Sequence, residues 1–245
     1  MNKYIHDPDF YERARARRRE LQEQYGHELT PADEMLQLAY DEKDDTELLK
    51  AIADGANPDV LSSDWVYPIL TTAIEDGRPE VAELLLDAGA DPMKWGYDLL
   101  WALCETGNAG LLRRVLSDYD VLPVKYIGDL IQCAVENGRL ECLRELRAAG
   151  VDLLADDGRA LCRACLANEH EIVEYLLHEC GAELELEYDD WSPLFFAAQG
   201  NAFESARIQL EAGADPTHED IAGGTPMRWA ASKQMLGLLQ RYDRK

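Results

Sequence analysis

The sequence predicts an all-α solenoid of helix-turn-helix units, preceded by an N-terminal capping helix. The first observation is a phrase that returns along the chain, as Glu80-Val-Ala-Glu-Leu-Leu-Leu-Asp-Ala-Gly-Ala-Asp-Pro92 and again, in altered form, over 171–182 and 204–216. The second is the regular spacing of its copies, and the third is a column of small residues ahead of each copy. One such unit cannot bury its apolar face alone, so repetition predicts stacking of neighbouring units.

The N-terminal element is predicted as a helix over 8–25, which begins after Asp7 and ends at Gly26. Its apolar residues Phe10, Ala14, Leu21 and Tyr25 offer a side that could be buried. The helix is also rich in arginine, and two interpretations are open: a basic arm that contacts a partner, or a cap whose arginines lean on the acidic repeats. The arginines scatter around the helix, which favours the cap, so we assign 1–30 to a capping helix and 31–245 to the repeats. The arginines are Arg13, Arg15, Arg17, Arg18 and Arg19.

The repeats are predicted to number about seven, each with a short first helix and a leucine-rich second helix. A small residue stands on each first helix where neighbouring helices approach closely. A glycine closes most second helices, because it accepts the left-handed backbone that ends a helix. The third unit lacks that glycine and predicts an irregular loop near 117–128, and the last unit reads as a cap too short for a full second helix. The small-residue column is Ala39, Ala73, Leu103 (the exception), Ala134, Ala164, Ala197 and Ala230, and the closing positions are Gly55, Gly89, Tyr119, Gly150, Gly181 and Gly213.

Two phrases carry a family resemblance. Ser192-Pro193-Leu194-Phe195-Phe196-Ala197-Ala198 and Thr225-Pro226-Met227-Arg228-Trp229-Ala230-Ala231 place a proline in the first helical turn behind a predicted Ser or Thr cap. With the spacing of the units, these residues resemble the ankyrin repeat over 31–245. The resemblance implies turns that project as fingers beside the first helices, and a concave face that binds proteins without catalysing a reaction.

Charge narrows the range of partners. The 245 residues carry 48 Asp and Glu against 24 Lys and Arg, a net charge of -24, and residues 1–30 contribute none of that excess. Such a chain disfavours direct binding of nucleic acid or of an anionic membrane, and favours a basic protein partner. Without an apolar signal or membrane segment, and with six irregularly spaced cysteines, we expect a cytoplasmic protein that is a monomer when free.

Catalytic and metal chemistry is not expected, and neither is a cofactor. Cys162-x-x-Cys165, followed by His170 and Cys180, suggests a zinc or redox sensor as one alternative function. The repeat register favours a packing role instead, since Cys165 falls in a column with Ala198 and Cys104, and a free cysteine is often a small buried hydrophobe.

The predicted partner-binding surface follows the fingers and the exposed ends of the first helices. We set the start of each second helix at Lys43, Gly77, Gly107, Gly138, Asn168 and Asn201, and the finger positions before these marks are rich in Trp, Tyr and Asp. Trp and Tyr dominate many interfaces, and carboxylates beside them attract cationic partners. The alternative is that the rings stack on one another along the fingers. The predicted residues are Asp41, Glu42, Asp64, Trp65, Tyr67, Glu75, Asp76, Trp95, Tyr97, Glu105, Tyr126, Glu136, Asp189 and Trp191.

These observations predict a non-catalytic module that engages and inhibits a basic protein. Analogy with compact acidic inhibitors suggests a toxin-neutralising, immunity-type role. A scaffold that holds several partners at once is the other alternative to that role.

Overall fold

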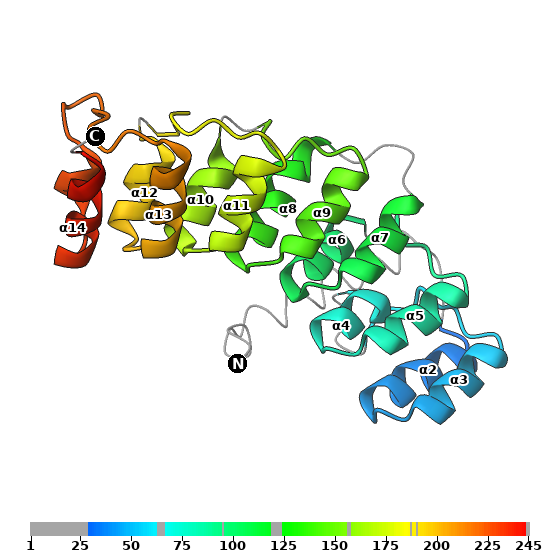
Figure 1. Ribbon diagram of the computed structural model, residues 1–245. Helices are drawn as coiled ribbons and strands as arrows, with labels where there is room; N and C mark the ends of the chain where they lie inside the picture. Colours follow the sequence, from blue (N-terminus) through cyan, green and yellow to red (C-terminus); the bar gives the residue numbers. More distant parts are fainter. Residues whose placement is uncertain are drawn as a thin grey trace. The chain divides into compact units, whose positions relative to one another are not determined.

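A computed structural model describes residues 29–62, 67–94, 96–118, 124–155, 158–186, 188–189 and 191–243. Every regular element within these ranges is helical, as predicted, and Figure 1 shows them in sequence order. The chain divides into two compact units, Met1–Thr106 and Gly107–Lys245. The capping helix predicted over 8–25 lies outside the described residues.

Unit 1 holds two helix pairs and the first helix of a third. Thr30 begins the first pair with a capping box, in which its hydroxyl accepts from the Asp33 amide and the Asp33 carboxylate accepts from the Thr30 amide. The first helices of the two complete pairs pack on their own second helices, and the second pair also contacts the helix that follows it. In order, the helices are α2 (Pro31–Asp41), α3 (Asp45–Ala53), α4 (Ile69–Glu75), α5 (Pro79–Asp87) and α6 (Gly96–Thr106).

Unit 2 continues the same alternation. In Figure 1, first helices α8, α10 and α12 form one row and second helices α9, α11 and α13 form another. Contacts run along the rows as well as within the pairs, so each repeat packs on its neighbours. The elements are α7 (Ala109–Ser117), α8 (Val124–Glu136), α9 (Leu140–Ala148), α10 (Arg159–Ala167), α11 (His170–His178), α12 (Pro193–Gln199), α13 (Phe203–Ala212), the 3₁₀ turn η1 (Pro226–Trp229) and α14 (Lys233–Tyr242).

The turn between the helices of a pair has the backbone that the repeat register predicts. Each of the six marked residues has a positive φ, including the three that are not glycine: Lys43 at 58°, Asn168 at 61° and Asn201 at 54°. The marks were nevertheless placed wrongly as helix starts. Each second helix begins two residues later, because the left-handed residue ends the turn and cannot enter an α-helix.

The core follows the small-residue column. Ala39, Ala73, Leu103 and their counterparts in the next three repeats are at most 3% exposed, with the leucines of the second helices packed around them. The last member, Ala230, is only half-buried and has an extended backbone. It follows η1 instead of lying on a helix, since the first helix of the last repeat is reduced to this 3₁₀ turn.

Two further expectations were wrong. Helix α14 has ten residues, so the last repeat is short in its first helix and not in its second. Residues 124–128, expected in an irregular loop, lie in α8. Ser192 and Thr225 hold the N-cap positions with a proline in the first turn behind each, as predicted, although neither hydroxyl makes a cap hydrogen bond. Ser192 Oγ is buried and has no hydrogen-bond partner among the described residues.

Candidate partner-binding surface

The ends of the first helices in unit 1 carry the predicted carboxylates on the surface. Asp41 and Glu42 end α2, Glu75 and Asp76 end α4, and all four residues are exposed. They occupy equivalent places in two successive repeats, where the chain leaves the first helix of each repeat and enters the turn. Glu105, in the last turn of α6, is likewise exposed.

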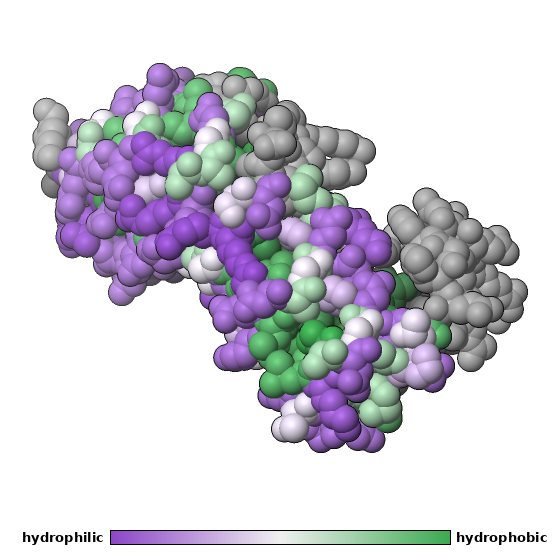
Figure 2. Space-filling model, turned by 90° about the vertical axis from the view of Figure 1, so that its right-hand side faces the viewer, coloured by the Kyte–Doolittle hydropathy of each residue, from purple (hydrophilic) through white to green (hydrophobic). Residues whose placement is uncertain are grey.

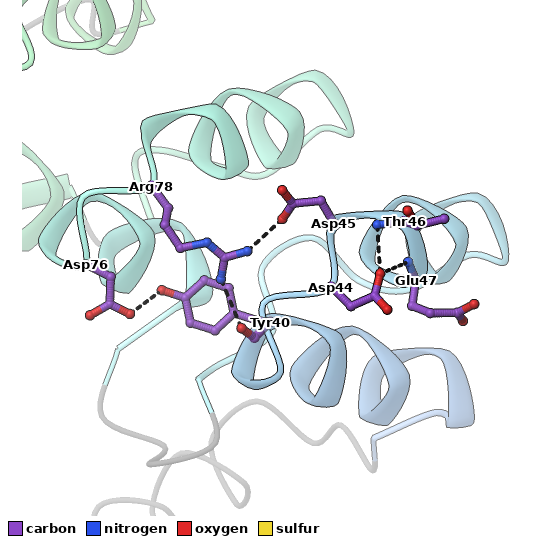
Figure 3. A network of polar contacts seen from close by, with 7 residues as sticks. All are labelled: Tyr40, Asp44, Asp45, Thr46, Glu47, Asp76 and Arg78. Atoms are coloured by element: carbon purple, nitrogen blue, oxygen red, sulfur yellow. Dashed lines mark hydrogen bonds and ion pairs between the residues drawn. The ribbon is translucent and has the colours of Figure 1, made fainter.

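Asp76 also has a packing role that the sequence did not reveal (Figure 3). The buried Tyr40 hydroxyl donates to Asp76 Oδ2 at 2.7 Å, and Arg78 lies over the Tyr40 ring at 4.7 Å from its centroid. Arg78 also donates to the Tyr40 carbonyl at 2.9 Å and to Asp45 at 2.7 Å. Burial, together with the hydrogen bond to Asp76, raises the pKa of Tyr40 well above its usual value. This network joins the first repeat to the second.

The predicted aromatic residues of unit 1 are only partly described. Asp64, Trp65 and Trp95 lie outside the described residues. Tyr67 is half-buried in the bend before α4. Tyr97 was expected in a finger, but it lies in the first turn of α6, where its ring is 6.0 Å from that of Trp101.

The predicted residues Tyr126 and Glu136 both lie on α8 in unit 2. Tyr126 was expected in a finger, and its backbone is instead helical. Glu136 is exposed at the end of the helix, where it accepts from Gln132 at 2.8 Å and lies 3.6 Å from Arg163. Its carboxylate therefore takes part in contacts within the repeats.

The aromatic cluster of unit 2 consists of Tyr188, Trp191, Phe195, Phe196 and Trp229. Trp191 is its centre, with ring centroids 5.8 Å from Phe195, 5.6 Å from Phe196 and 4.7 Å from Trp229. Phe195 is fully buried, whereas Trp191 is half-buried and Trp229 is 39% exposed. The cluster thus has a buried base and two indole rings at its outer edge. The Trp191 and Trp229 rings, from neighbouring repeats, are tilted by 50° to each other.

Trp229 was not predicted as a site residue. The register contained a signal, because Trp229 stands one residue before the small-residue column, in the same place as Phe196. The prediction considered only fingers and helix ends, and so passed over this position on the first helix.

Hydrogen bonds hold both fingers that carry the cluster. Tyr188 and Trp191 exchange two backbone hydrogen bonds of 2.9 and 3.1 Å, so the finger turns through exposed Asp189, whose φ is 51°. In the next repeat, Asp220 accepts from two backbone amides and from the side chain of Trp229, and these bonds hold its pKa below the usual range. The rings are therefore positioned before any partner arrives.

The cysteines have the character of packing residues. Cys162 and Cys165 are fully buried, and Cys180 is half-buried. Burial raises the pKa of Cys162 to about 12 and that of Cys165 well above its ordinary value, which disfavours the thiolate needed for metal binding or redox chemistry. Among the described residues, no group of His, Cys, Asp and Glu has an arrangement fit for a metal ion.

The fold defines a class of protein, a helical repeat protein built from stacked helix pairs. Comparison with known proteins identifies the family. A family model for ankyrin repeats, in three copies, matches residues 130–220 and 161–240. The human ASB11 ankyrin repeat domain is similar in structure, with a TM-score of 0.69 and 25% identity over 87% of this chain and 97% of that chain.

The ankyrin repeat domain of Bcl-3, a member of the IkappaB family, matches with a TM-score of 0.62 and 24% identity over 84% of this chain and 97% of that one. No curated protein matches the sequence. The chain is an ankyrin-repeat protein. Ankyrin-repeat domains are protein-binding modules and are typically not catalytic. None of the helices in the described part of the chain has the length and hydropathy needed to cross a bilayer.

Proposed function

We propose that this ankyrin-repeat protein binds a basic protein and blocks its activity, with the outer rings of the aromatic cluster as the anchor in unit 2. The observation that carries the proposal is the placement of Trp191 and Trp229, which lie 4.7 Å apart with part of their area in solvent, next to a finger that carries exposed Asp189. Large flat rings that are already fixed in place are the side chains that most often dominate an interface.

The chemistry of the partner follows from the rings and the charge together. An arginine or lysine over an indole face gains about 0.5 to 2 kcal/mol, depending on how fully it is desolvated. Within the chain, arginines already use tyrosine rings in this way, with Arg78 over Tyr40 at 4.7 Å and Arg144 over Tyr175 at 4.4 Å. A cationic side chain of the partner can use the outer indoles in the same manner.

The acidic excess acts on the rate of encounter. A net charge of -24 attracts a cationic protein over distances near the Debye length, about 8 Å at physiological ionic strength. The exposed carboxylates of Asp41, Glu42 and Glu75 contribute to this field. Binding blocks the partner if the partner's cationic surface is also the surface that it needs for activity, as for a nuclease-like toxin neutralised by an immunity-type inhibitor. We favour this role over that of a scaffold, because one sign of charge suits one kind of partner.

The test begins with this chain immobilised as bait in a native lysate. Proteins that bind it at low salt are collected by release at high salt. We expect a retained protein with a basic isoelectric point whose activity falls when this chain is added in equimolar amount. If the retained proteins are acidic, or if they keep their full activity when bound to this chain, the proposal is wrong.

Binding kinetics then test the anchor. Trp229→Ala should raise the dissociation rate by about 30-fold, the effect of losing roughly 2 kcal/mol at an interface hot spot. Phe203→Ala is the matched control, since Phe203 is also a partly exposed ring (37%) but lies on α13, outside the cluster. Equal dissociation rates for the two variants would exclude the cluster as the anchor.

The charge is tested by the association rate. Glu75→Lys should slow association at low salt more than Glu83→Lys, which changes an exposed glutamate on second helix α5. Asp76 is unsuitable for this experiment, because its loss would also disturb Tyr40.

A further inference from the structure

The outer face of the first repeat carries apolar side chains that no described element covers. Met35 and Leu38 on α2 are 42% and 49% exposed. Figure 2 shows hydrophobic residues gathered among hydrophilic ones at the height of helices α2 to α5. A repeat of this kind stacks on a preceding one through this face, and the described residues contain no preceding repeat.

The column of Met35 shows how unusual that exposure is. Met35 stands four residues before the small-residue column, and its counterparts in the six later repeats are all buried. These counterparts are Ile69, Leu99, Leu130, Ala160, Pro193 and Pro226. The exposure of Met35 therefore marks a surface that lacks its cover.

A groove of about 540 Å³ lies beside Met35, between α2 and α3. Its lining is mixed: Met35 and Ala51 are apolar, whereas Glu47, Lys50 and Asp54 are polar, and Glu47 pairs with Lys50 at 3.2 Å. In the column of Glu47, the next five repeats have Val81, Leu111, Cys142, Ile172 and Ser205, all buried. A segment that covers the first repeat should therefore be apolar in one part and cationic in another.

We propose that residues 8–25 of the same chain form a helix that packs over this groove and against Met35. At 100° per residue, Phe10, Ala14, Leu21 and Tyr25 fall within a stripe of about 60°. This stripe supplies the apolar part. Arg17 lies at its edge, midway along the helix, and supplies a cation for Glu47 and Asp54.

Continuity of the chain favours this occupant over any other. Thr30, which caps α2, is itself part of the groove's lining, so the segment over 8–25 ends only five residues before the groove. An eighteen-residue helix is about 27 Å long, which exceeds the roughly 16 Å of α2 and is enough to cover it. A covalently attached segment also has a high effective concentration at a neighbouring site.

Oxidation of methionine in the full-length chain tests the proposal. Dilute hydrogen peroxide is applied, and the sulfoxide at each methionine is followed by mass spectrometry of peptides. Met93, 49% exposed, reports an open methionine, and fully buried Met235 reports an intact fold. We expect Met35 to react at least about tenfold more slowly than Met93, which corresponds to an uncovered state populated below about 10%.

Two double variants identify the cover. Phe10→Gln with Leu21→Gln removes apolar groups from the stripe and should bring the Met35 rate to that of Met93, while Met235 stays protected. Glu12→Gln with Glu23→Gln makes the same kind of change on the opposite side of the helix and should leave Met35 protected.

Each contrary result overturns the proposal. Met35 that reacts as fast as Met93 in the unaltered chain has no cover. Protection that survives the change at Phe10 and Leu21 comes from another segment. Protection that disappears on dilution comes from a second copy of the chain.

Discussion

The network around Tyr40 makes a quantitative prediction about how the first two repeats hold together. Replacing Arg78 by methionine keeps the aliphatic length of the side chain and removes its guanidinium. We expect this change to lower the free energy of unfolding by about 2 to 3 kcal/mol, because the guanidinium makes three contacts with the first repeat.

The magnitude follows from those contacts. The hydrogen bond from Arg78 to the Tyr40 carbonyl, 2.9 Å long, has a charged donor and contributes about 1.5 kcal/mol. Stacking on the Tyr40 ring adds about 0.5 to 1 kcal/mol. The ion pair with Asp45 adds less than about 0.5 kcal/mol, since the Asp45 side chain is 67% exposed and screened by water.

Urea unfolding measures the loss, and hydrogen exchange of the α2 and α3 amides shows where it occurs, since a repeat contacts only its neighbours. Arg207→Met is the control, because Arg207 is 45% exposed and pairs with Glu204 and Glu211 on its own helix. The control should change the free energy of unfolding by less than about 0.5 kcal/mol. Equal losses for the two variants, or faster exchange confined to unit 2, would refute the reasoning.

Two other predictions concern the turns and the thiols. Gly77→Ala should destabilise the protein by about 1 to 2 kcal/mol through backbone strain alone, because φ is 70° and no atom lies within 4 Å of the added methyl. Gly237→Ala lies in helix α14, where the added methyl is equally unhindered, and it should stabilise the protein by up to about 1 kcal/mol. The urea midpoints of the two variants should therefore shift in opposite directions, and a shift of both in the same direction would contradict the prediction. With a thiol reagent at pH 8, half-buried Cys180 should react first in the native protein, and buried Cys162 only on unfolding. Early modification of Cys162, detected by peptide mass spectrometry, would restore the sensor hypothesis.

The architecture could be predicted from the sequence because its signals are local and repeated. The closing glycines described here and the turn residues all have left-handed backbone, which the register located even where Lys43 or Asn168 stands in place of glycine. The 3₁₀ turn of the last repeat depends on tertiary contacts instead. There the Ala231 amide donates to the Ala198 carbonyl of the preceding repeat at 3.1 Å, and the Ser232 hydroxyl donates to Asn201 at 2.6 Å. These contacts compete with helical hydrogen bonds in a way that no local pattern reveals.

The candidate surface could be predicted only in part, for the same reason. Its acidic helix ends are where the register places them. The bond between Asp76 and Tyr40 joins residues 36 positions apart, so a carboxylate that looks free in the sequence is a packing group. Trp229 escaped prediction because its place at the edge of the cluster depends on Trp191 of the preceding repeat.

The two ends of the repeat series differ in a way that bears on the proposed cover. A solenoid needs a polar outer face at each end. The last helix, α14, meets this need by burying Met235, Leu238 and Leu239 while its exposed positions carry lysine, glutamine and arginine. The first repeat changes only half of its outer face in this way, with Glu47 in a column that is mostly apolar elsewhere and Lys50 paired with it, and keeps Met35 and Leu38. A face that is half polar suits an amphipathic helix better than it suits either water or another ankyrin repeat. This is the chemistry that residues 8–25 provide.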